Sequence, residues 1–195
     1  MRVIAGTFRS RLLLSPPGTE TRPTSDRLRE TLFNILAPRI DGSRFVDLYA
    51  GTGAVGIEAI SRGAEFVWFA EKAEPAWRTL RKNLAALKIA SGYALEDRGT
   101  GALLQRLGKL GQPGQLIDIV FLDPPWEAEA EYAATLGFLG SAAGSKLLAP
   151  DAIVIAEHAT RSKFALADRY GVLARTRLYK QGDASLSFYA PAIED

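Results

Sequence analysis

The chain has 195 residues, of which 47% are hydrophobic and 24% are charged, and its formal net charge is +2 at neutral pH. This length and composition favour a folded globular domain with a sizeable core. The absence of cysteine excludes disulfides, thiolate metal sites and cysteine nucleophiles, and with the single histidine His158 a histidine-based metal site is not expected. No apolar run reaches the length of a membrane span and no secretion-type segment follows Met1, so we expect a cytoplasmic protein without membrane contact or bound metal.

The first 20 residues predict a β-hairpin or an extended arm. Short apolar stretches surround a glycine and close on two prolines, and a segment of this size must lie on the main domain or on a partner to be stable. Residues 1–44 carry eight arginines against four carboxylates. Arginine binds phosphate bidentately and stacks on bases, although the same charges can simply form a solvated surface.

A helix is predicted next, beginning at Thr24 or Ser25 and reaching residue 36. Either residue can cap the helix, and Asp26 lies in its first turn. The apolar residues at helical spacing are Leu28, Leu32, Ile35 and Leu36. We therefore expect an amphipathic helix whose other face carries arginines and whose start favours anions.

A glycine-rich turn between a strand and a helix follows. Residues 45–50 form the first expected strand of a central sheet, and Gly51-Thr52-Gly53-Ala54-Val55-Gly56 comes directly after it. The pattern then predicts a helix over 54–62 and a second strand over 66–70. This GxGxxG layout brings the backbone close to a nucleotide-like ligand, and Glu71 after the second strand can accept both hydroxyls of a ribose.

The same layout suits a dinucleotide-binding domain, so a nicotinamide-dependent oxidoreductase is an alternative at this point. Asp47 favours a different cofactor, because it lies four residues before Gly51, where its carboxylate can receive a ligand ammonium group or brace the loop. A ligand with a ribose, an adenine and a charged amino acid end, such as S-adenosylmethionine, would use Asp47 and Glu71 together. The motif near residue 123 also supplies no hydride-acceptor chemistry.

Residues 75–87 predict a second helix with one apolar face, and residues 93–97 are expected to hold a third strand. An acidic residue after that strand can reach the adenine of a bound nucleoside, and Asp97 is the candidate. Two glycines within residues 98–101 leave the end of this strand undefined.

The most specific stretch of the sequence runs from residue 118 to residue 126. Residues 119–122 are an unbroken apolar run, which is typical of a parallel strand covered on both faces. Ligands of open α/β sheets lie beyond the carboxyl ends of such strands, where Asp123-Pro124-Pro125-Trp126 stands. Both prolines fix φ and donate no hydrogen bond, so we expect a stiff loop that presents acceptors only.

Such a loop suits an exocyclic amino group on a nucleobase. The Asp123 carboxylate and the Pro124 carbonyl can accept its two N–H bonds, while Trp126 offers a flat face to the ring. Two fixed acceptors draw the nitrogen toward tetrahedral geometry and stabilise the positive charge that develops as the amine attacks an electrophile. The simpler alternative is a strand-ending turn in which Trp126 is only packed.

The last third of the chain is expected to complete the sheet. Residues 127–140 predict an acidic, alanine-rich helix or lid, and residues 152–156 predict another buried strand. His158 is interpreted as structural, because no carboxylate or serine is placed in sequence to form a triad with it. Residues 172–189 alternate around a Gly-Asp pair and predict an antiparallel hairpin at the sheet edge.

These motifs together resemble known methyltransferases. The segment Asp47-Leu48-Tyr49-Ala50-Gly51-Thr52-Gly53-Ala54-Val55-Gly56 is similar to the cofactor loop of class I S-adenosylmethionine-dependent methyltransferases, and Asp123-Pro124-Pro125-Trp126 is similar to the catalytic motif of those that methylate exocyclic amines. Three further segments narrow the resemblance to one family of these methyltransferases. They are Arg2-Val3-Ile4-Ala5-Gly6, Arg22-Pro23-Thr24-Ser25-Asp26-Arg27-Leu28-Arg29-Glu30 and Tyr179-Lys180-Gln181-Gly182. Nearly end to end, the chain resembles the RsmD family of bacterial 16S rRNA guanine-N2 methyltransferases, which modify guanine 966 of that RNA. Trp126 departs from the tyrosine that is usual in that family.

The resemblance implies an α/β fold of the Rossmann-like class I methyltransferase type. We expect a seven-stranded, mostly parallel sheet in the order 3-2-1-4-5-7-6 with helices on both faces, an N-terminal β-hairpin arm over residues 1–20, and one methyltransferase domain over residues 21–195. The implied reaction moves a methyl group from S-adenosylmethionine to the N2 amine of a guanine in 16S rRNA of the small ribosomal subunit. The protein is expected to act as a monomer.

The resemblance also implies roles for individual residues. The expected catalytic residues are Asp123, Pro124 and Trp126, and the target base would leave its stack to reach them. The expected cofactor-binding residues are Asp47, Tyr49, Gly51, Gly53, Glu71 and Asp97. The expected RNA-binding residues are Arg2, Arg9, Arg11, Arg22 and Arg27. Two alternatives are an adenine-N6 methyltransferase acting on DNA or RNA, since the same acceptor pair grips either amine, and a non-catalytic ribosome-assembly factor that keeps the fold and the basic arm.

Overall fold

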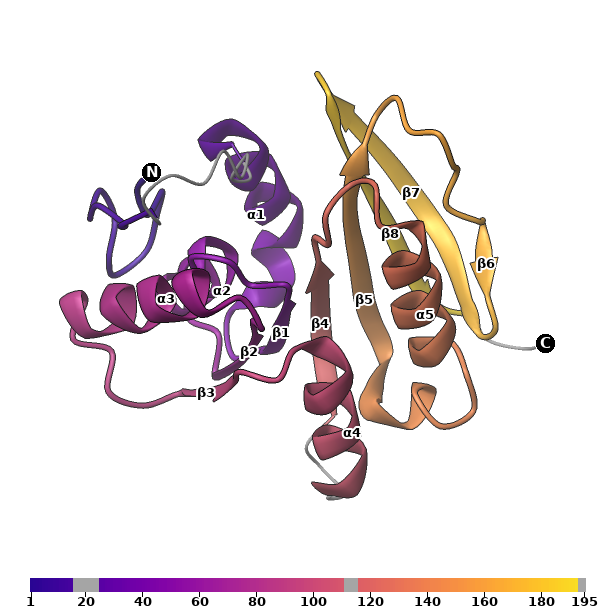
Figure 1. The fold of residues 1–195 in the computed structure, drawn as a ribbon, viewed down its shortest axis with the longest axis horizontal. Coiled ribbons are helices and arrows are strands. Elements are labelled where there is room, and N and C mark those ends of the chain that lie inside the picture. Colours follow the sequence, from indigo (N-terminus) through magenta and orange to yellow (C-terminus); the bar gives the residue numbers. More distant parts are fainter. Residues whose placement is uncertain (16–24, 111–115, 193–195) are drawn as a thin grey trace. The chain divides into compact units, whose positions relative to one another are not determined.

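The computed structural model describes residues 1–15, 25–110 and 116–192 (Figure 1). The chain divides into two compact units, Met1–Gly99 and Thr100–Asp195. None of the helices within the described ranges has an apolar stretch long enough to cross a membrane.

The first unit alternates helices and strands. Its elements are α1 (Asp26–Ile40), β1 (Arg44–Leu48), α2 (Ala54–Ser61), β2 (Phe66–Ala70), α3 (Glu74–Ala86) and β3 (Tyr93–Glu96). The three strands are parallel and lie in the order β3-β2-β1, because α2 and α3 each carry the chain back to start the next strand in the same direction. The predicted strand 66–70 is confirmed, and the predicted helices 54–62 and 75–87 are confirmed to within one residue at each end.

The helix α1 begins with a side-chain cap, as predicted. The Ser25 hydroxyl accepts the N–H of Leu28 at 3.1 Å, while Thr24 lies outside the described residues. Its buried apolar residues are Leu28, Leu32, Phe33, Leu36 and Ile40. Arg29 is buried with them, at 0% exposure. The expectation that the arginines occupy the opposite face is therefore wrong for Arg29, which is held by carboxylates rather than by water.

The N-terminal arm, described over residues 1–15, packs on the first unit. A single antiparallel bridge joins Arg2 to Leu12, and Val3 and Leu13 enter the core with 1% and 6% of their surface exposed. The predicted hairpin is thus reduced to one bridge around a turn, with its stability supplied by the unit beneath it, as its size requires.

The second unit begins with a helix and ends with an antiparallel sheet edge. Its elements are α4 (Thr100–Leu110), β4 (Ile117–Leu122), α5 (Glu129–Leu139), the short 3-10 helix η1 (Ser145–Leu147), β5 (Leu148–Ala159), β6 (Arg169–Tyr170), β7 (Leu173–Gln181) and β8 (Ala184–Pro191). The strand order is β4-β5-β8-β7-β6, with β4 parallel to β5 and the remaining pairs antiparallel.

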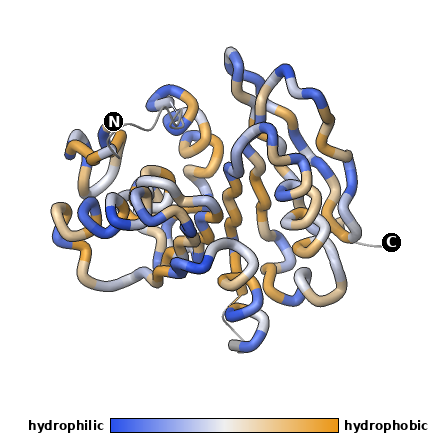
Figure 2. Tube along the Cα trace, in the orientation of Figure 1, coloured by the Kyte–Doolittle hydropathy of each residue, from blue (hydrophilic) through white to orange (hydrophobic). Residues whose placement is uncertain are grey.

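The core strands β4 and β5 of this unit are mainly hydrophobic, as Figure 2 shows. Residues 119–122 of β4 are at most 1% exposed, which confirms the predicted buried strand. In the register of the neighbouring strands, Leu122 lies beside Ala156 and Ala159 lies beside Ala184. The β7–β8 turn and the residues after β4 therefore lie at the same edge of this unit's sheet.

The described residues form eight strands rather than the expected seven, three in the first unit and five in the second. The additional strand is β6, whose two residues pair with the start of β7 around Gly171. Two residues carry no periodicity that a sequence pattern can reveal. Within each unit the strand order agrees with the corresponding part of the expected order.

Candidate functional site

The glycine-rich loop after β1 is held by two carboxylates of the first unit. The Asp47 Oδ2 atom accepts the N–H of Gly56 at 2.8 Å. The Glu71 carboxylate accepts the N–H of Gly51 at 2.8 Å through Oε2 and the N–H of Ala73 at 2.6 Å through Oε1. Glu71 thus orders the turn between β1 and α2, and Asp47 holds the first turn of α2.

Two of the glycines in this loop have backbone angles that favour glycine. Gly51 has a φ of 56° and Gly53 has a φ of 79°. A Cβ on Gly53 would lie 2.2 Å from Leu80 Cδ1, and a Cβ on Gly56 would lie 2.2 Å from the ring of Phe69. Gly56 therefore permits the close packing of α2 on β2 that a nucleotide-binding turn needs.

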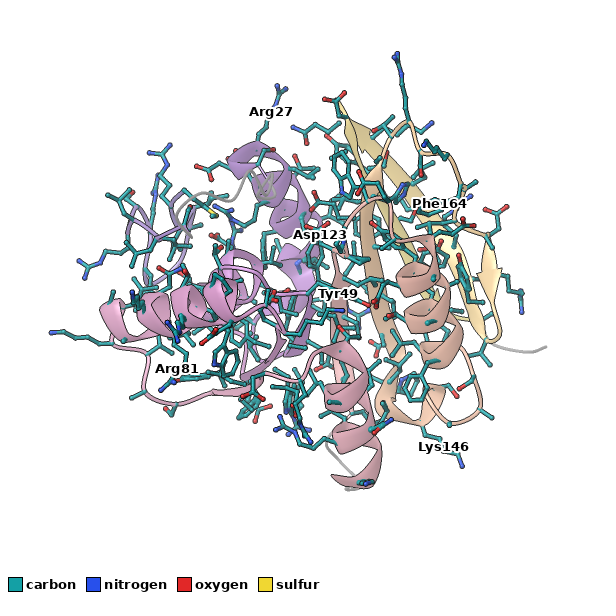
Figure 3. The ribbon with its side chains drawn as sticks, in the orientation of Figure 1. Arg27, Tyr49, Arg81, Asp123, Lys146 and Phe164 are labelled. Carbon is teal, nitrogen blue, oxygen red and sulfur yellow. The ribbon has the colours of Figure 1, made fainter. Side chains whose placement is uncertain are left out.

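Tyr49 precedes this loop and has a φ of 64°, which is unusual for a residue with a side chain. Its side chain is half-buried, and Figure 3 labels it. Strained backbone of this kind is found where a chain must present groups to a ligand.

Asp47 is almost fully buried, with 2% of its surface exposed. Burial raises the pKa of its carboxyl to about 7, opposed by the hydrogen bond from Gly56 and reinforced by the negative charge of Glu71. A carboxyl of this kind is ready to ionise at neutral pH when a positive charge approaches it.

The end of β3 carries two carboxylates with different environments. Glu96 is buried, at 3% exposure, and accepts the Nε–H of Arg98 at 2.8 Å. This hydrogen bond raises the pKa of Arg98 above its ordinary value. Asp97 is exposed immediately after the strand, and its assignment as the adenine contact stays a prediction.

The second unit presents the loop formed by residues 123–126 at the carboxyl end of β4, where Figure 3 labels Asp123. Pro124 is buried, Asp123 and Trp126 are half-buried, and Pro125 is exposed. The Pro124 carbonyl accepts a hydrogen bond from the Tyr132 hydroxyl at 3.2 Å, and the Pro125 carbonyl accepts the N–H of Ala128 at 2.8 Å. Neither proline can donate, and the prediction that this loop presents acceptors to a ligand stays a prediction.

The predicted RNA-binding arginines within the described residues are exposed. Arg2, Arg9 and Arg11 lie on the arm, and Arg27 lies in the first turn of α1, where Figure 3 shows it extending outward. Arg2 is paired loosely with Asp26 at 3.8 Å. Arg22 lies outside the described residues.

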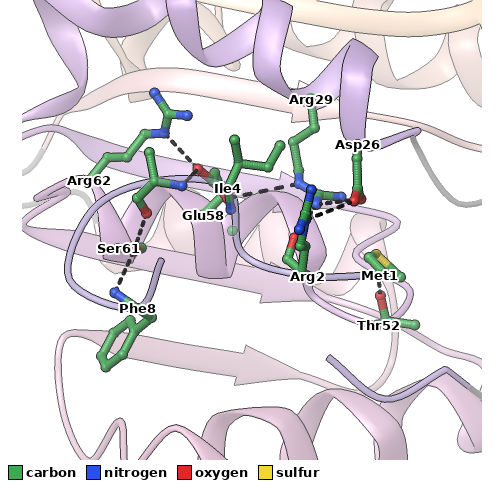
Figure 4. A network of polar contacts seen from close by, with 12 residues as sticks. Met1, Arg2, Ile4, Phe8, Asp26, Arg29, Thr52, Glu58, Ser61 and Arg62 are labelled. Atoms are coloured by element: carbon green, nitrogen blue, oxygen red, sulfur yellow. Dashed lines mark hydrogen bonds and ion pairs between the residues drawn. The ribbon is translucent and has the colours of Figure 1, made fainter. Parts of the chain in front are cut away.

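A buried ionic cluster beneath the arm was not predicted from the sequence. Glu58 accepts the N–H of Ile4 at 2.7 Å and the N–H of Ala5 at 3.0 Å. The same carboxylate is paired with Arg62 at 2.7 Å and with Arg29 at 3.9 Å, as Figure 4 shows. Glu58 was the one carboxylate within the apolar helix 54–62, and that was the signal available.

Asn83 on α3 connects the arm to the glycine-rich loop. Its Oδ1 atom accepts the N–H of Leu14 at 2.8 Å, and its Nδ2 group donates to the carbonyl of Leu14 at 3.2 Å and to that of Thr52 at 3.0 Å. The arm and the loop therefore share one buried amide, although 69 residues separate Asn83 from Leu14.

His158 is bonded within the second unit, in agreement with a structural interpretation. Its Nδ1 atom lies 3.0 Å from the carbonyl of Ala159 and its Nε2 atom lies 2.9 Å from the Ser187 hydroxyl. Burial lowers the pKa of His158. In the part of the chain that the structure describes, no group of three or more histidine or acidic side chains is arranged to hold a metal ion.

The comparisons with known proteins agree with this geometry. A family model described as conserved hypothetical protein 95 matches residues 1–190. The chain belongs to this family. Together with relatives named ribosomal RNA small subunit methyltransferase D, this match confirms the resemblance to the RsmD family that the motifs indicated.

Three similar proteins illustrate the family. A Bacillus subtilis protein, YlbH, provisionally named an rRNA methyltransferase, is 34% identical over 191 residues, which cover 97% of this chain and 98% of that protein. Ribosomal RNA small subunit methyltransferase D of Escherichia coli is 40% identical over 126 residues, which cover 65% of this chain and 60% of that protein. The solved structure of Escherichia coli yhhF, provisionally described as a methyltransferase, has a TM-score of 0.80 and 30% identity, and covers 100% of this chain and 99% of that one. These comparisons confirm the expected Rossmann-like α/β fold.

Proposed function

We propose that this protein transfers a methyl group from S-adenosylmethionine to the exocyclic N2 amine of a guanine in 16S rRNA of the small ribosomal subunit. The observation that carries the proposal is the loop at the end of β4, where the half-buried Asp123 is followed by two prolines that cannot donate a hydrogen bond, in a chain whose relatives include rRNA methyltransferases.

The cofactor would be held by the glycine-rich loop and its two carboxylates. S-adenosylmethionine carries a ribose, an adenine, an ammonium and a carboxylate, and it supplies an electrophilic methyl group. Glu71 already accepts two backbone amides, and each of its oxygens has a further lone pair for a ribose hydroxyl. Asp47 would pair with the ammonium group, while Tyr49, Gly51 and Gly53 shape the backbone around the ligand and Asp97 would approach the adenine.

The catalytic loop would act on the guanine amine. The Asp123 carboxylate and the Pro124 carbonyl would each accept one N–H of the N2 group, which orients its nitrogen lone pair toward the methyl group and stabilises the developing positive charge. Trp126 would stack on the base after it leaves the RNA helix. The methylated amine would lose one proton after the transfer, because the two acceptors stabilise its positive charge until then.

The arm would hold the RNA backbone. Arg2, Arg9, Arg11 and Arg27 are exposed and can each contact a phosphate, and Arg22 belongs to the same proposed set. The proposal includes a cytoplasmic location, where small subunits are assembled, action as a monomer without a metal ion, and an arm over residues 1–20 that serves a methyltransferase domain over residues 21–195.

The decisive experiment transfers a labelled methyl group to small subunits from cells that lack this gene, followed by nucleoside analysis of the RNA. We expect N2-methylguanosine, and we expect subunits from cells that have the gene to accept little label because they are already modified. N6-methyladenosine would replace the proposal with an adenine-N6 activity. Cofactor binding without any transfer would favour an assembly role.

A further inference from the structure

Tyr132 lies fully buried on α5, close to the proposed catalytic loop of the same unit. Its exposed fraction is 0%, and its ring packs at 5.6 Å from the ring of Phe164. Its hydroxyl lies 3.2 Å from the Pro124 carbonyl and 2.8 Å from the Glu157 carbonyl. One side chain therefore contacts the backbone beyond β4 and the backbone near the end of β5.

The register of the two strands explains why a single hydroxyl reaches both carbonyls. The parallel strands β4 and β5 pair Leu122 with Ala156, so Pro124 and Glu157 follow at the same edge of the sheet. The tyrosine hydroxyl has one proton, which the two carbonyls share, with the shorter distance to Glu157.

The proline pair makes this hydroxyl more important than an ordinary buried hydrogen bond. Pro124 and Pro125 have no N–H, so neither residue can donate a backbone hydrogen bond that helps to fix the loop. Their carbonyls are held differently: that of Pro125 accepts the nearby N–H of Ala128, whereas that of Pro124 accepts the Tyr132 hydroxyl of α5. A carbonyl oxygen has two lone pairs, so one remains for a ligand when Tyr132 occupies the other.

We propose that Tyr132 is a positioning residue for methyl transfer: it fixes the Pro124 carbonyl in the orientation that accepts the target amine. This inference rests on the proposed function. The residue acts through the loop and does not touch the substrate, so its removal should slow turnover more than it weakens the binding of either substrate.

A matched control is available in the same unit. Tyr189 on β8 is also fully buried, at 0% exposure, and its hydroxyl donates to the Ala167 carbonyl at 2.9 Å. The substitutions Tyr132→Phe and Tyr189→Phe each remove one buried hydroxyl and keep the ring, so their effects on folding should be alike. Of these two tyrosines, Tyr132 alone is bonded to the proposed catalytic loop.

The test compares methyl transfer to unmodified small subunits by the parent and the two variants. We expect Tyr132→Phe to lower kcat roughly tenfold, with the KM for subunits and the Kd for S-adenosylmethionine changed less than about twofold. Tyr189→Phe should leave kcat within about twofold of the parent. Equal losses of kcat in both variants, or an unchanged kcat in Tyr132→Phe, would overturn the proposal.

A second measurement does not depend on activity. Amide hydrogen exchange over residues 126–131, which include the Ala128 N–H bonded to the Pro125 carbonyl, reports how firmly the loop is held. We expect faster exchange there in Tyr132→Phe alone. If the parent shows no methyl transfer, the proposed function fails, and exchange then decides the structural part of the inference: unchanged exchange in Tyr132→Phe would overturn it.

Discussion

The two loops that carry the predicted site residues are fixed by opposite chemistry. The glycine-rich loop of the first unit exposes backbone N–H groups, and carboxylates hold it: Asp47 accepts from Gly56 and Glu71 accepts from Gly51. The proline loop of the second unit exposes carbonyls, and a hydroxyl of α5 holds it through Pro124. In each case the supporting side chain is complementary to the polar groups that the loop contains.

The same contrast extends beyond the two loops. In the first unit, Glu58 also accepts two amides from the arm, whereas in the second unit Tyr189 also donates to a backbone carbonyl. Burial costs an ionised carboxylate more desolvation free energy than it costs a neutral hydroxyl, and this cost is visible in Asp47, whose pKa is raised to about 7. Substitutions in the first unit should therefore act mainly through charge, whereas substitutions in the second unit should act mainly through the position of the proline loop.

The largest effect is expected from Asp123→Ala. Removing one acceptor of the developing charge should lower kcat by about 10²- to 10³-fold, while the Kd for S-adenosylmethionine changes little. Asp123→Asn keeps an acceptor oxygen and should lose less. The measurement is single-turnover methyl transfer together with calorimetry of cofactor binding.

Glu71→Ala, in the first unit, is to be compared with Asp123→Ala in the second. It should weaken cofactor binding before it alters the chemical step, because Glu71 orders the loop at Gly51. Equal weakening of cofactor binding by Asp123→Ala and Glu71→Ala would contradict the division of roles between the two loops.

A large effect on stability rather than on catalysis is expected at the buried ionic cluster. Glu58→Ala removes the buried carboxylate that lies 3.9 Å from Arg29, together with the acceptor of two arm amides. We expect the free energy of unfolding to fall by about 3 to 5 kcal/mol in urea titrations. Glu74→Ala, which removes an exposed partner of Arg78, is the control and should change stability little. Similar losses in both variants would show that burial does not decide the effect.

Asp47 provides a pH-dependent test. Its folded-state pKa is about 7 against an ordinary value of 3.8, so between these pH values the folded state binds more protons than the unfolded state. The free energy of unfolding should therefore fall as pH rises through this window, by up to about 1.4 kcal/mol per pH unit, and level off above pH 7. Asp47→Asn lacks the titrating group, and its stability relative to the parent should rise from pH 4 to pH 7. Parallel profiles for the two proteins would contradict the burial argument.

Local sequence patterns predicted most of the helices and strands. The strand 66–70 and the helices near it could be predicted because their apolar runs are separated by glycines. The helix α4 was missed, although Leu103, Leu104 and Leu107 follow helical spacing, because Gly99 and Gly101 stand at its start and glycine weakens a helical pattern.

The two site motifs could also be predicted, because the residues of each loop are contiguous in sequence. The distant side chains that hydrogen-bond to the arm and to these loops could not be predicted. Glu58 reaches Ala5 across 53 residues, Asn83 reaches Leu14 across 69, and Tyr132 reaches Glu157 across 25. Such pairs are created by the packing of helices on strands, and no local spacing encodes which buried acceptor will meet which donor. The residue roles that were assigned from the motifs stay predictions until the variants are measured.

The smallest effect is expected from the arm, and it differs from the others in its dependence on salt. Arg9 and Arg11 are exposed on the arm. If each binds one phosphate, the double substitution Arg9→Ala and Arg11→Ala should weaken subunit binding several-fold and flatten its salt dependence by about 0.7 to 0.9 in slope for each arginine replaced. Point substitutions are better than deletion of the arm, because Val3 and Leu13 belong to the core.

Arg81→Ala, on the exposed surface of α3, is the control for the arm, and Figure 3 shows its side chain extending from that helix. It removes one positive charge outside the arm and should leave the salt slope of subunit binding unchanged. An unchanged salt slope in the double variant as well would place the RNA elsewhere. Because the arm shares Asn83 with the glycine-rich loop, that result would leave the arm as a support for the cofactor loop.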